Sequence, residues 1–127
     1  FWLIQQLYYD EVLNKNNVRK IFLSQLKSGK IFLVAKINNQ FIGLITLSTH
    51  LDIQNGKVGQ IDEFIVDKKF RRKGLGKKLL IEITKEAKKL RCNELHLYSS
   101  FRRSKSAHKF YLKNKFNKTA FLFWKEI

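Results

Sequence analysis

The first part of the chain repeats apolar residues with the period of an α-helix. Four of them share one helical face: Val18, Ile21, Phe22 and Leu26. This spacing and the apolar residues before it predict helices over residues 3–13 and 18–27. Ser28 and Gly29 follow the second helix directly, and both residue types favour a helix end. The chain therefore opens with two short helices.

From residue 31 the pattern changes to runs of β-branched and large apolar residues. Residues 31–37 and 41–48 predict two strands, and the polar residues 38–40 between them predict the turn of a hairpin. The Asn-Gly pair at residues 55–56 is a second turn signal. Residues 57–66 then predict a third strand, antiparallel to the second.

The strongest helical pattern begins at Gly74. Its apolar stripe consists of Leu75, Leu79, Leu80, Ile83, Ala87 and Leu90. Residues 94–99 predict a further strand, residues 104–113 a further helix, and residues 119–127 a closing strand. This order predicts an α/β fold of the α+β sandwich type, in which helices flank a mixed, mostly antiparallel sheet. A doubly wound parallel sheet does not fit it.

Composition narrows the class of protein. At 127 residues with 44% hydrophobic content, the chain is long enough to bury a core as a single domain, residues 1–127. The apolar runs are shorter than the roughly 20 residues of a membrane span. The single cysteine, Cys92, excludes an internal disulfide and a cysteine-based zinc site. We expect a cytoplasmic protein without a membrane partner, and we expect a trimmed N-terminus because the chain begins at Phe1 and contains no methionine.

The formal net charge of +16 favours binding to anions, such as cofactor phosphates, acidic proteins or nucleic acid. The cations are scattered along the sequence, so a general bias toward lysine explains the charge equally well. A lysine-rich surface gives nucleic acid only a salt-sensitive affinity that does not depend on sequence. No known DNA- or RNA-binding motif is present.

The segment "FRRKGLGKKLL", residues 70–80, carries the clearest candidate chemistry. It joins a predicted strand to the start of the long helix, where the first backbone N–H groups lack intrahelical acceptors and the helix dipole is positive. Gly74 and Gly76 allow an anion to approach the backbone closely. Three cations precede them: Arg71, Arg72 and Lys73. These features together predict a phosphate-binding loop.

The spacing of the two glycines excludes the commoner phosphate loops. Only one residue separates them, which does not fit a P-loop, and Leu79 stands where a dinucleotide-binding fingerprint needs a third glycine or alanine. What remains is Arg71-x-x-Gly74-x-Gly76. This pattern resembles the acetyl-coenzyme A signature of the GNAT superfamily of N-acetyltransferases, (Gln/Arg)-x-x-Gly-x-(Gly/Ala).

The resemblance extends over residues 30–116. The strand "QIDEFIVDKKF", residues 60–70, is similar to the fourth strand of that family, and "SAHKFYLKNKF", residues 106–116, is similar to its second motif. Two positions depart from the family pattern. Lys115 replaces the glycine of the turn before the last strand, and Ser104 replaces an asparagine that contacts the cofactor.

The resemblance implies acetyl-coenzyme A as co-substrate and no metal. It assigns the pyrophosphate to the loop residues Arg71, Arg72, Lys73, Gly74, Leu75, Gly76 and Lys77. The backbone of Phe64, Ile65 and Val66 would pair with the pantetheine arm where the sheet splays. Ser104 would contact the cofactor through water or not at all.

The resemblance also assigns Tyr111 as the general acid that protonates the leaving thiolate. A phenol suits this role because its ordinary pKa of about 10 lies a little above that of a thiol, about 8.5. The alternative is a core aromatic, like its neighbour Phe110. His96, His108 and Cys92 are expected to be structural or inert.

The acceptor amine must lose a proton, and Asp62 and Glu63 are the available strand carboxylates. Because strand side chains alternate, we expect these two on opposite faces of the sheet. Asp62 is in phase with Val66 and aligns with a base position of polyamine-acetylating members of the family, so it is the first candidate for the base. A water wire, or a merely solvated Asp62, is the alternative.

We therefore predict an N-acetyltransferase that moves an acetyl group directly from acetyl-coenzyme A to a primary amine of a small molecule or protein. Two alternatives stay open: a non-catalytic domain that binds coenzyme A, and a basic acetyltransferase associated with RNA. We expect a monomer or a homodimer. The acceptor itself stays open among antibiotics, polyamines, amino acids, peptide N-termini and lysine side chains.

Overall fold

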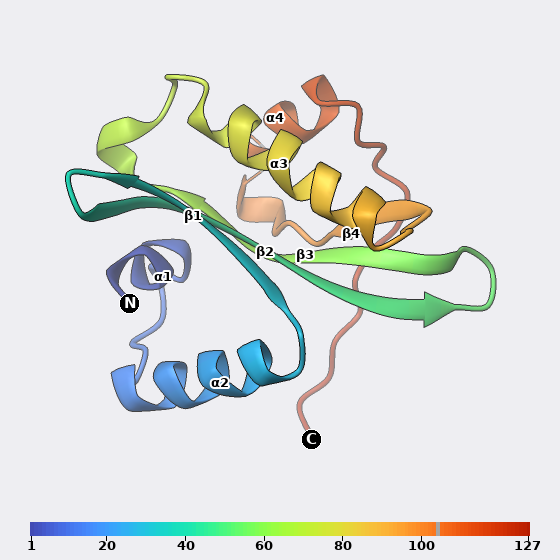
Figure 1. Cartoon of the computed structure of the whole chain (residues 1–127), viewed down its shortest axis with the longest axis horizontal. Helices are drawn as coiled ribbons and strands as arrows, with labels where there is room; N and C mark the ends of the chain where they lie inside the picture. Colours follow the sequence, from blue (N-terminus) through green and yellow to red (C-terminus); the bar gives the residue numbers. More distant parts are fainter. Residues whose placement is uncertain (104) are drawn as a thin grey trace. The chain divides into compact units, whose positions relative to one another are not determined.

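The computed structural model describes residues 1–103 and 105–127. The chain divides into a larger unit, residues 1–96, and a smaller C-terminal unit, residues 97–127. In the larger unit, helices cover both faces of a sheet (Figure 1). No helix in the described part of the chain is long and apolar enough to cross a membrane.

Helix α1 spans Trp2–Leu7, so the predicted helix over residues 3–13 is too long. Its early end is explained by Gln5, whose side-chain amide donates to the carbonyl oxygens of Tyr8 and Glu11. The same amide accepts a hydrogen bond from the backbone N–H of Leu13. The Gln5 side chain thus provides hydrogen bonds to three backbone groups of residues 8–13, in place of the bonds that a continued helix would form.

Helix α2 spans Lys15–Lys27 and begins three residues before the predicted start at residue 18. Asn14 is its N-cap, and the Asn14 side chain accepts two backbone N–H groups of the first turn at 3.0 and 3.1 Å. The helix ends at Ser28 and Gly29, as predicted. Gly29 has a φ of 89°, the left-handed conformation that favours glycine.

The sheet has the strand order β1-β2-β3-β4. Its strands are β1 (Ile31–Ile37), β2 (Gln40–Asp52), β3 (Gly56–Val66) and β4 (Glu94–Leu97). The first three are antiparallel neighbours, and helix α3 (Leu75–Lys89) links β3 to β4, which completes the predicted mixed sheet. β2 is longer than predicted and β4 is shorter. β4 has four residues against the eleven of β3, so it can accompany only part of β3.

The core lies on both faces of this sheet (Figure 1). On the α1 side, a buried cluster consists of Leu3, Ile4, Leu7, Leu44 and Ile65. On the opposite side, α3 buries four residues of its predicted stripe, Leu79, Leu80, Ile83 and Ala87. A Cβ atom at Gly43 of β2 would lie 2.9 Å from Leu79 Cδ1, so the helix packs closely on the sheet. This packing fixes the start of α3 beyond the end of β3.

The pairing of β2 with β3 contains a β-bulge. The ladder includes the pairs Ile45↔Phe64 and Leu47↔Ile61. Between them, Thr46 of β2 faces two residues of β3, Asp62 and Glu63. The extra residue breaks the alternation of side chains along β3.

The C-terminal unit contains a 3-10 turn, η2 (Phe101–Arg103), and helix α4 (Ala107–Lys113). The predicted helix over residues 104–113 thus begins at Ala107, and Ser104 lies outside the described residues. The predicted closing strand over residues 119–127 is wrong, because this segment is neither helix nor strand and is exposed throughout. Its residues have high strand propensity, but a strand also needs a hydrogen-bonded neighbour, and no described strand pairs with it.

Candidate active site

The start of α3 has the geometry of an anion site. Gly74 is the N-cap, with a left-handed φ of 79°, and no side chain caps the helix. The first backbone hydrogen bond of the helix runs from Lys78 N to Gly74 O, at 3.1 Å. The N–H groups of Leu75, Gly76 and Lys77 therefore lack helical acceptors and are available to a ligand.

The loop before α3 is held in place at its base. Asp67 is buried at the end of β3, and its Oδ1 accepts the N–H of Lys69 in the 3-10 turn η1 (Lys68–Phe70). Arg71 Nε donates to Val66 O at 2.8 Å, which ties the loop to the end of the strand. The predicted cations Arg71, Arg72 and Lys73 are all exposed around this point.

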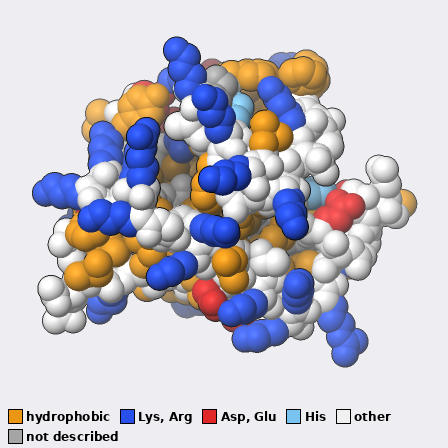
Figure 2. All heavy atoms as spheres, turned by 90° about the horizontal axis from the view of Figure 1, so that it is seen from above, with side chains coloured by type: hydrophobic (Ala, Val, Ile, Leu, Met, Phe, Trp, Pro, Cys, Tyr) orange, Lys and Arg blue, Asp and Glu red, His pale blue; other side chains and the backbone are white. Residues whose placement is uncertain are grey.

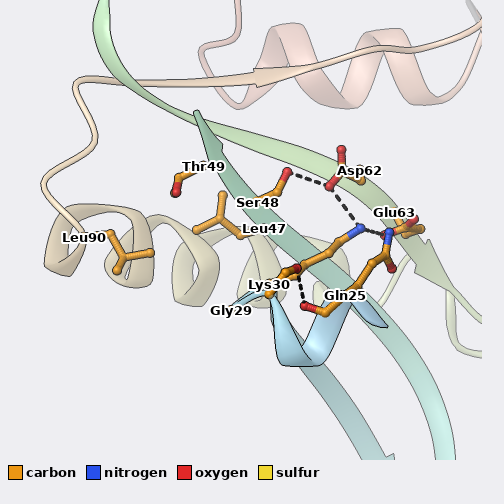
Figure 3. Close-up of a pocket in the computed structure, with 10 residues that line it drawn as sticks. Gln25, Gly29, Lys30, Leu47, Ser48, Thr49, Asp62, Glu63 and Leu90 are labelled. Atoms are coloured by element: carbon orange, nitrogen blue, oxygen red, sulfur yellow. Dashed lines mark hydrogen bonds and ion pairs between the residues drawn. The ribbon is translucent and has the colours of Figure 1, made fainter. Parts of the chain in front are cut away.

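A pocket of about 610 Å³ lies in the larger unit, next to the bulge (Figure 3). Its lining residues are Gln25, Ser28, Gly29, Lys30, Leu47, Ser48, Thr49, Asp62, Glu63 and Leu90. They come from the C-terminal end of α2, from β2 and β3, and from the end of α3. β1 begins at Ile31, which pairs with Leu47, so β2 extends past β1 and its edge at Ser48 and Thr49 lines the pocket.

Lys30 enters this pocket because of how α2 ends. The N–H of Gly29 donates to Leu26 O at 3.2 Å, and the N–H of Lys30 donates to Gln25 O at 3.0 Å. These two bonds form a Schellman motif, in which the second residue after the cap turns back toward the helix. That position usually holds an apolar residue, and here it holds a lysine that is only 8% exposed.

Both strand carboxylates meet this lysine. Lys30 Nζ lies 3.0 Å from Asp62 Oδ2 and 2.9 Å from Glu63 Oε2 (Figure 3). The expectation that Asp62 and Glu63 point to opposite faces of the sheet is therefore wrong. The bulge opposite Thr46 inserts a residue, so two consecutive side chains face the same side.

Two hydroxyl groups complete the cluster. Ser48 Oγ donates to Asp62 Oδ2 at 2.8 Å. Thr46 Oγ1 donates to Glu63 Oε2 and accepts the backbone N–H of Glu63 at 3.0 Å, which supplies the hydrogen bond that the bulge removes from the ladder. Each carboxylate is thereby fixed by an ammonium and a hydroxyl. The Asp62 side chain keeps 33% of its surface exposed, against 16% for Glu63, so Asp62 is the more accessible of the two.

Tyr111 belongs to the C-terminal unit, on α4. Burial raises the pKa of Tyr111 above its ordinary value, and the positive charge of Arg103 partly opposes this effect. The Tyr111 ring makes edge contacts with Phe110 and Phe116, with centroid distances of 5.7 and 5.8 Å. A phenol with a raised pKa stays protonated at neutral pH, which a general acid requires.

The remaining candidates do not line the pocket. His96 Nε2 lies 2.7 Å from Glu94 Oε2 on β4, and Cys92 is a free, half-buried thiol. His108 Nε2 is buried and has no hydrogen-bond partner in the part of the chain that is described. Among the same residues, no group of three or more His, Cys, Asp or Glu side chains is placed to hold a metal ion.

Sequence reasoning missed Lys30, Thr46 and Ser48 as residues of the pocket. A signal for Lys30 does exist, because it follows the Ser-Gly helix end at the position that turns inward. The register shift at Thr46 has no such signal. A bulge depends on how two strands pair, and neither strand alone encodes it.

The chain is thus an α/β domain in which a strand leads through a glycine loop into an uncapped helix, the geometry of a candidate anion site. The model of the acetyltransferase (GNAT) family matches residues 2–116. The chain belongs to this family, whose members use acetyl-coenzyme A as co-substrate. The match confirms the resemblance and extends it from residue 30 back to residue 2.

Solved structures share this fold over nearly the whole chain. A putative acetyltransferase from Agrobacterium tumefaciens has a TM-score of 0.82 at 22% identity, with 97% of this chain and 89% of that chain covered. Glucosamine-6-phosphate N-acetyltransferase from Arabidopsis thaliana has a TM-score of 0.78 at 21% identity, with 98% of this chain and 86% of that chain covered. An aminoglycoside acetyltransferase from an uncultured soil metagenomic sample has a TM-score of 0.79 at 18% identity, with 98% of this chain and 84% of that chain covered. A comparison with curated proteins finds no match.

Proposed function

We propose that this protein is an N-acetyltransferase that moves an acetyl group from acetyl-coenzyme A to a primary amine. The observation that carries the proposal is the uncapped first turn of α3 behind the left-handed Gly74, in a chain of the acetyltransferase family. We assign the activity to one domain, residues 1–127, acting as a monomer or homodimer in the cytoplasm.

The loop residues fit the pyrophosphate of the co-substrate. A Cβ atom built on Gly74 would meet nothing within 4 Å, so the space over the loop is open to a ligand. The free N–H groups of Leu75, Gly76 and Lys77 would bind the phosphate oxygens, with Gly74 setting the turn. Arg71, Arg72 and Lys73 would add positive charge around them. The backbone of Phe64, Ile65 and Val66 would pair with the pantetheine arm, and Ser104 would reach the co-substrate through water at most.

Bound acetyl-coenzyme A supplies an acetyl thioester, and the protein supplies two proton transfers. Asp62 would accept the proton of the acceptor ammonium, directly or through a water molecule, which frees the nitrogen lone pair. That nitrogen then forms a bond to the carbonyl carbon, the carbon–sulfur bond breaks, and the nitrogen, positively charged after the attack, releases its second proton to water. Tyr111 would donate its phenolic proton to the departing sulfur and regain a proton from solvent.

The pocket around Lys30, Asp62 and Glu63 is our proposed acceptor site. Its carboxylates would hold the ammonium of an incoming amine, because opposite charges attract strongly in a partly buried site. The named activities of two structural neighbours concern amine-bearing sugars, as glucosamine-6-phosphate and aminoglycosides are. This supports a small molecule as acceptor, with a peptide amine as the second candidate.

The first experiment measures release of free thiol from acetyl-coenzyme A across a panel of amines, together with calorimetric binding of coenzyme A. We expect turnover with at least one amine, and we expect Gly74→Glu to reduce coenzyme A affinity by at least about 100-fold, because a carboxylate would enter the phosphate site. Gly74→Ala is the matched control, because it shares the backbone strain but not the charge. Coenzyme A binding without turnover on the whole panel would favour the non-catalytic domain, and equal affinity for Gly74→Glu would refute the loop assignment.

A further inference from the structure

The pocket contains an internal ammonium group that the proposed reaction does not use. Lys30 is 8% exposed, and lysine is among the residues that proteins bury least often. Its Nζ contacts both carboxylates of the proposed acceptor site, at 3.0 and 2.9 Å. An acceptor amine that enters this site therefore meets carboxylates that already hold one positive charge.

Lys30 cannot readily leave this position. Its backbone N–H is bonded to Gln25 O in the Schellman motif, and its Nζ lies 5.7 Å from the centroid of the Phe32 ring, within cation–π range. Ser48 and Thr46 hold the two carboxylates from the other side. The ammonium is thus a fixed part of the pocket wall.

The charges of the cluster leave room for one more cation. Two carboxylates and one ammonium give a formal surplus of one negative charge, which one incoming ammonium neutralises. A second ammonium on the same acceptor would enter a site that is already neutral, next to Lys30. Like charges at close range in a partly buried site repel strongly.

We infer that Lys30 is a specificity-determining residue, which restricts the acceptor site to amines with a single positive charge near the reacting nitrogen. This inference rests on the proposed function and narrows its substrate class. The preferred acceptors are primary monoamines, including amines that carry neutral hydroxyl groups. Diamines whose two ammonium groups are separated by a short carbon chain are discriminated against at the binding step, so the effect appears in KM rather than in kcat.

A series of variants with different pocket charge tests this inference. Wild type and the double variant Lys30→Met/Glu63→Gln both have a formal surplus of one negative charge, Lys30→Met has two and Glu63→Gln has none. The measured quantity is the ratio of kcat/KM for 1,4-diaminobutane to that for 1-aminobutane. We expect Lys30→Met to raise this ratio about 10-fold, as Coulomb's law predicts for one unit charge several ångströms away. The double variant should return it to within about twofold of wild type.

Lys36→Met is the matched control. Lys36 also lies over a phenylalanine ring, with its Nζ 5.1 Å from the Phe41 centroid, but it is exposed on β1 and does not line the pocket. We expect no change in the ratio for this variant. The ratio of the calorimetric Kd values of 1-aminobutane and 1,4-diaminobutane should rise in Lys30→Met by the same factor, and this readout does not require turnover.

The outcomes separate this inference from the proposed function. Turnover by wild type with a ratio that stays constant across the charge series would overturn the role of Lys30 and leave the acetyltransferase intact. If Lys30→Met does not fold because its carboxylates lose their partner, the comparison of wild type, Glu63→Gln and the double variant still decides the question. A double variant that prefers the diamine would also refute the inference. Absence of turnover and of amine binding in wild type would refute the proposed acceptor site itself.

Discussion

Tyr111 shows how one residue can meet the demands of the proposed chemistry through its surroundings. Burial among aromatic rings raises the pKa of its phenol, and the charge of Arg103 offsets only part of that effect. The neutral form is therefore the stable one at every pH up to about 10, the ordinary value of a phenol. A group in this state can give up a proton to a thiolate and is then reprotonated from water.

Replacing Tyr111 tests this role directly. Tyr111→Phe should lower kcat by about 10- to 1000-fold, the range expected for the loss of a proton donor, and should change coenzyme A affinity little. Tyr98→Phe is the control, since Tyr98 lies in the same unit and is 68% exposed. In wild type, kcat should show no alkaline loss due to Tyr111 below about pH 10. An unchanged kcat in Tyr111→Phe would place the acid at another residue.

At the residue scale, the sequence singled out the two carboxylates that meet at Lys30 but not their arrangement. Asp62 and Glu63 follow each other in a strand, and alternation would separate them. The bulge opposite Thr46 brings them together on Lys30. The glycine loop was predictable because its chemistry is local, whereas the pocket depends on pairing between segments that are distant in sequence.

At the scale of secondary structure, two helices end with a left-handed residue at a position where glycine is usual. Arg91 and Lys115, the residues after the caps of α3 and α4, adopt left-handed φ values of 60° and 68°. After α4, Phe116 N donates to Tyr111 O at 3.0 Å and Lys115 N donates to Leu112 O at 3.1 Å, which completes a Schellman motif. The contact between the Tyr111 and Phe116 rings accompanies it. The turn that the family forms with glycine is therefore retained at Lys115.

This conformation costs a residue with a Cβ atom about 1 kcal/mol relative to glycine. Lys115→Gly should therefore raise the free energy of unfolding by about 1 kcal/mol, less the entropy that glycine loses on folding. Urea denaturation measures the change, and Lys109→Gly, at an exposed position inside α4, should instead lower stability by about 1 kcal/mol. A destabilised Lys115→Gly variant would contradict the assigned turn.

The extents of the helices and strands were predicted where the pattern is periodic and missed where tertiary contacts decide. The stripe of α3 and the strands of the first hairpin follow from residue spacing alone. The end of α1 depends on the Gln5 amide, which no periodicity reveals. The segment 119–127 has strand propensity but no hydrogen-bonded neighbour among the described strands.

At the scale of the whole molecule, the formal net charge is +16. Figure 2 shows lysine and arginine side chains distributed across one face, with few acidic groups between them. Exposed lysines recur along α3 at Lys77, Lys78, Lys85, Lys88 and Lys89. Such a distribution attracts polyanions but presents no arrangement that reads a sequence.

Nucleic-acid binding should accordingly be weak and independent of sequence. We expect two duplex DNA oligonucleotides of unrelated sequence to bind with the same Kd, about 10⁻⁴ to 10⁻⁶ M at physiological salt, and the affinity to fall steeply as salt rises. Fluorescence anisotropy measures both quantities. A tenfold preference for one sequence, or for a structured RNA, would support the RNA-associated alternative instead.

The bulge at Asp62 and Glu63 also bears on how such a protein can evolve. The register shift is held by backbone pairing on either side and by the Thr46 hydroxyl, which accepts the Glu63 N–H group, and none of these contacts involves the Asp62 side chain. Mutations at these two codons can therefore retune the pocket for new metabolites while the hairpin keeps its shape. Selection can act on substrate range at this point as long as the buried Lys30 ammonium keeps a carboxylate partner or is replaced together with it.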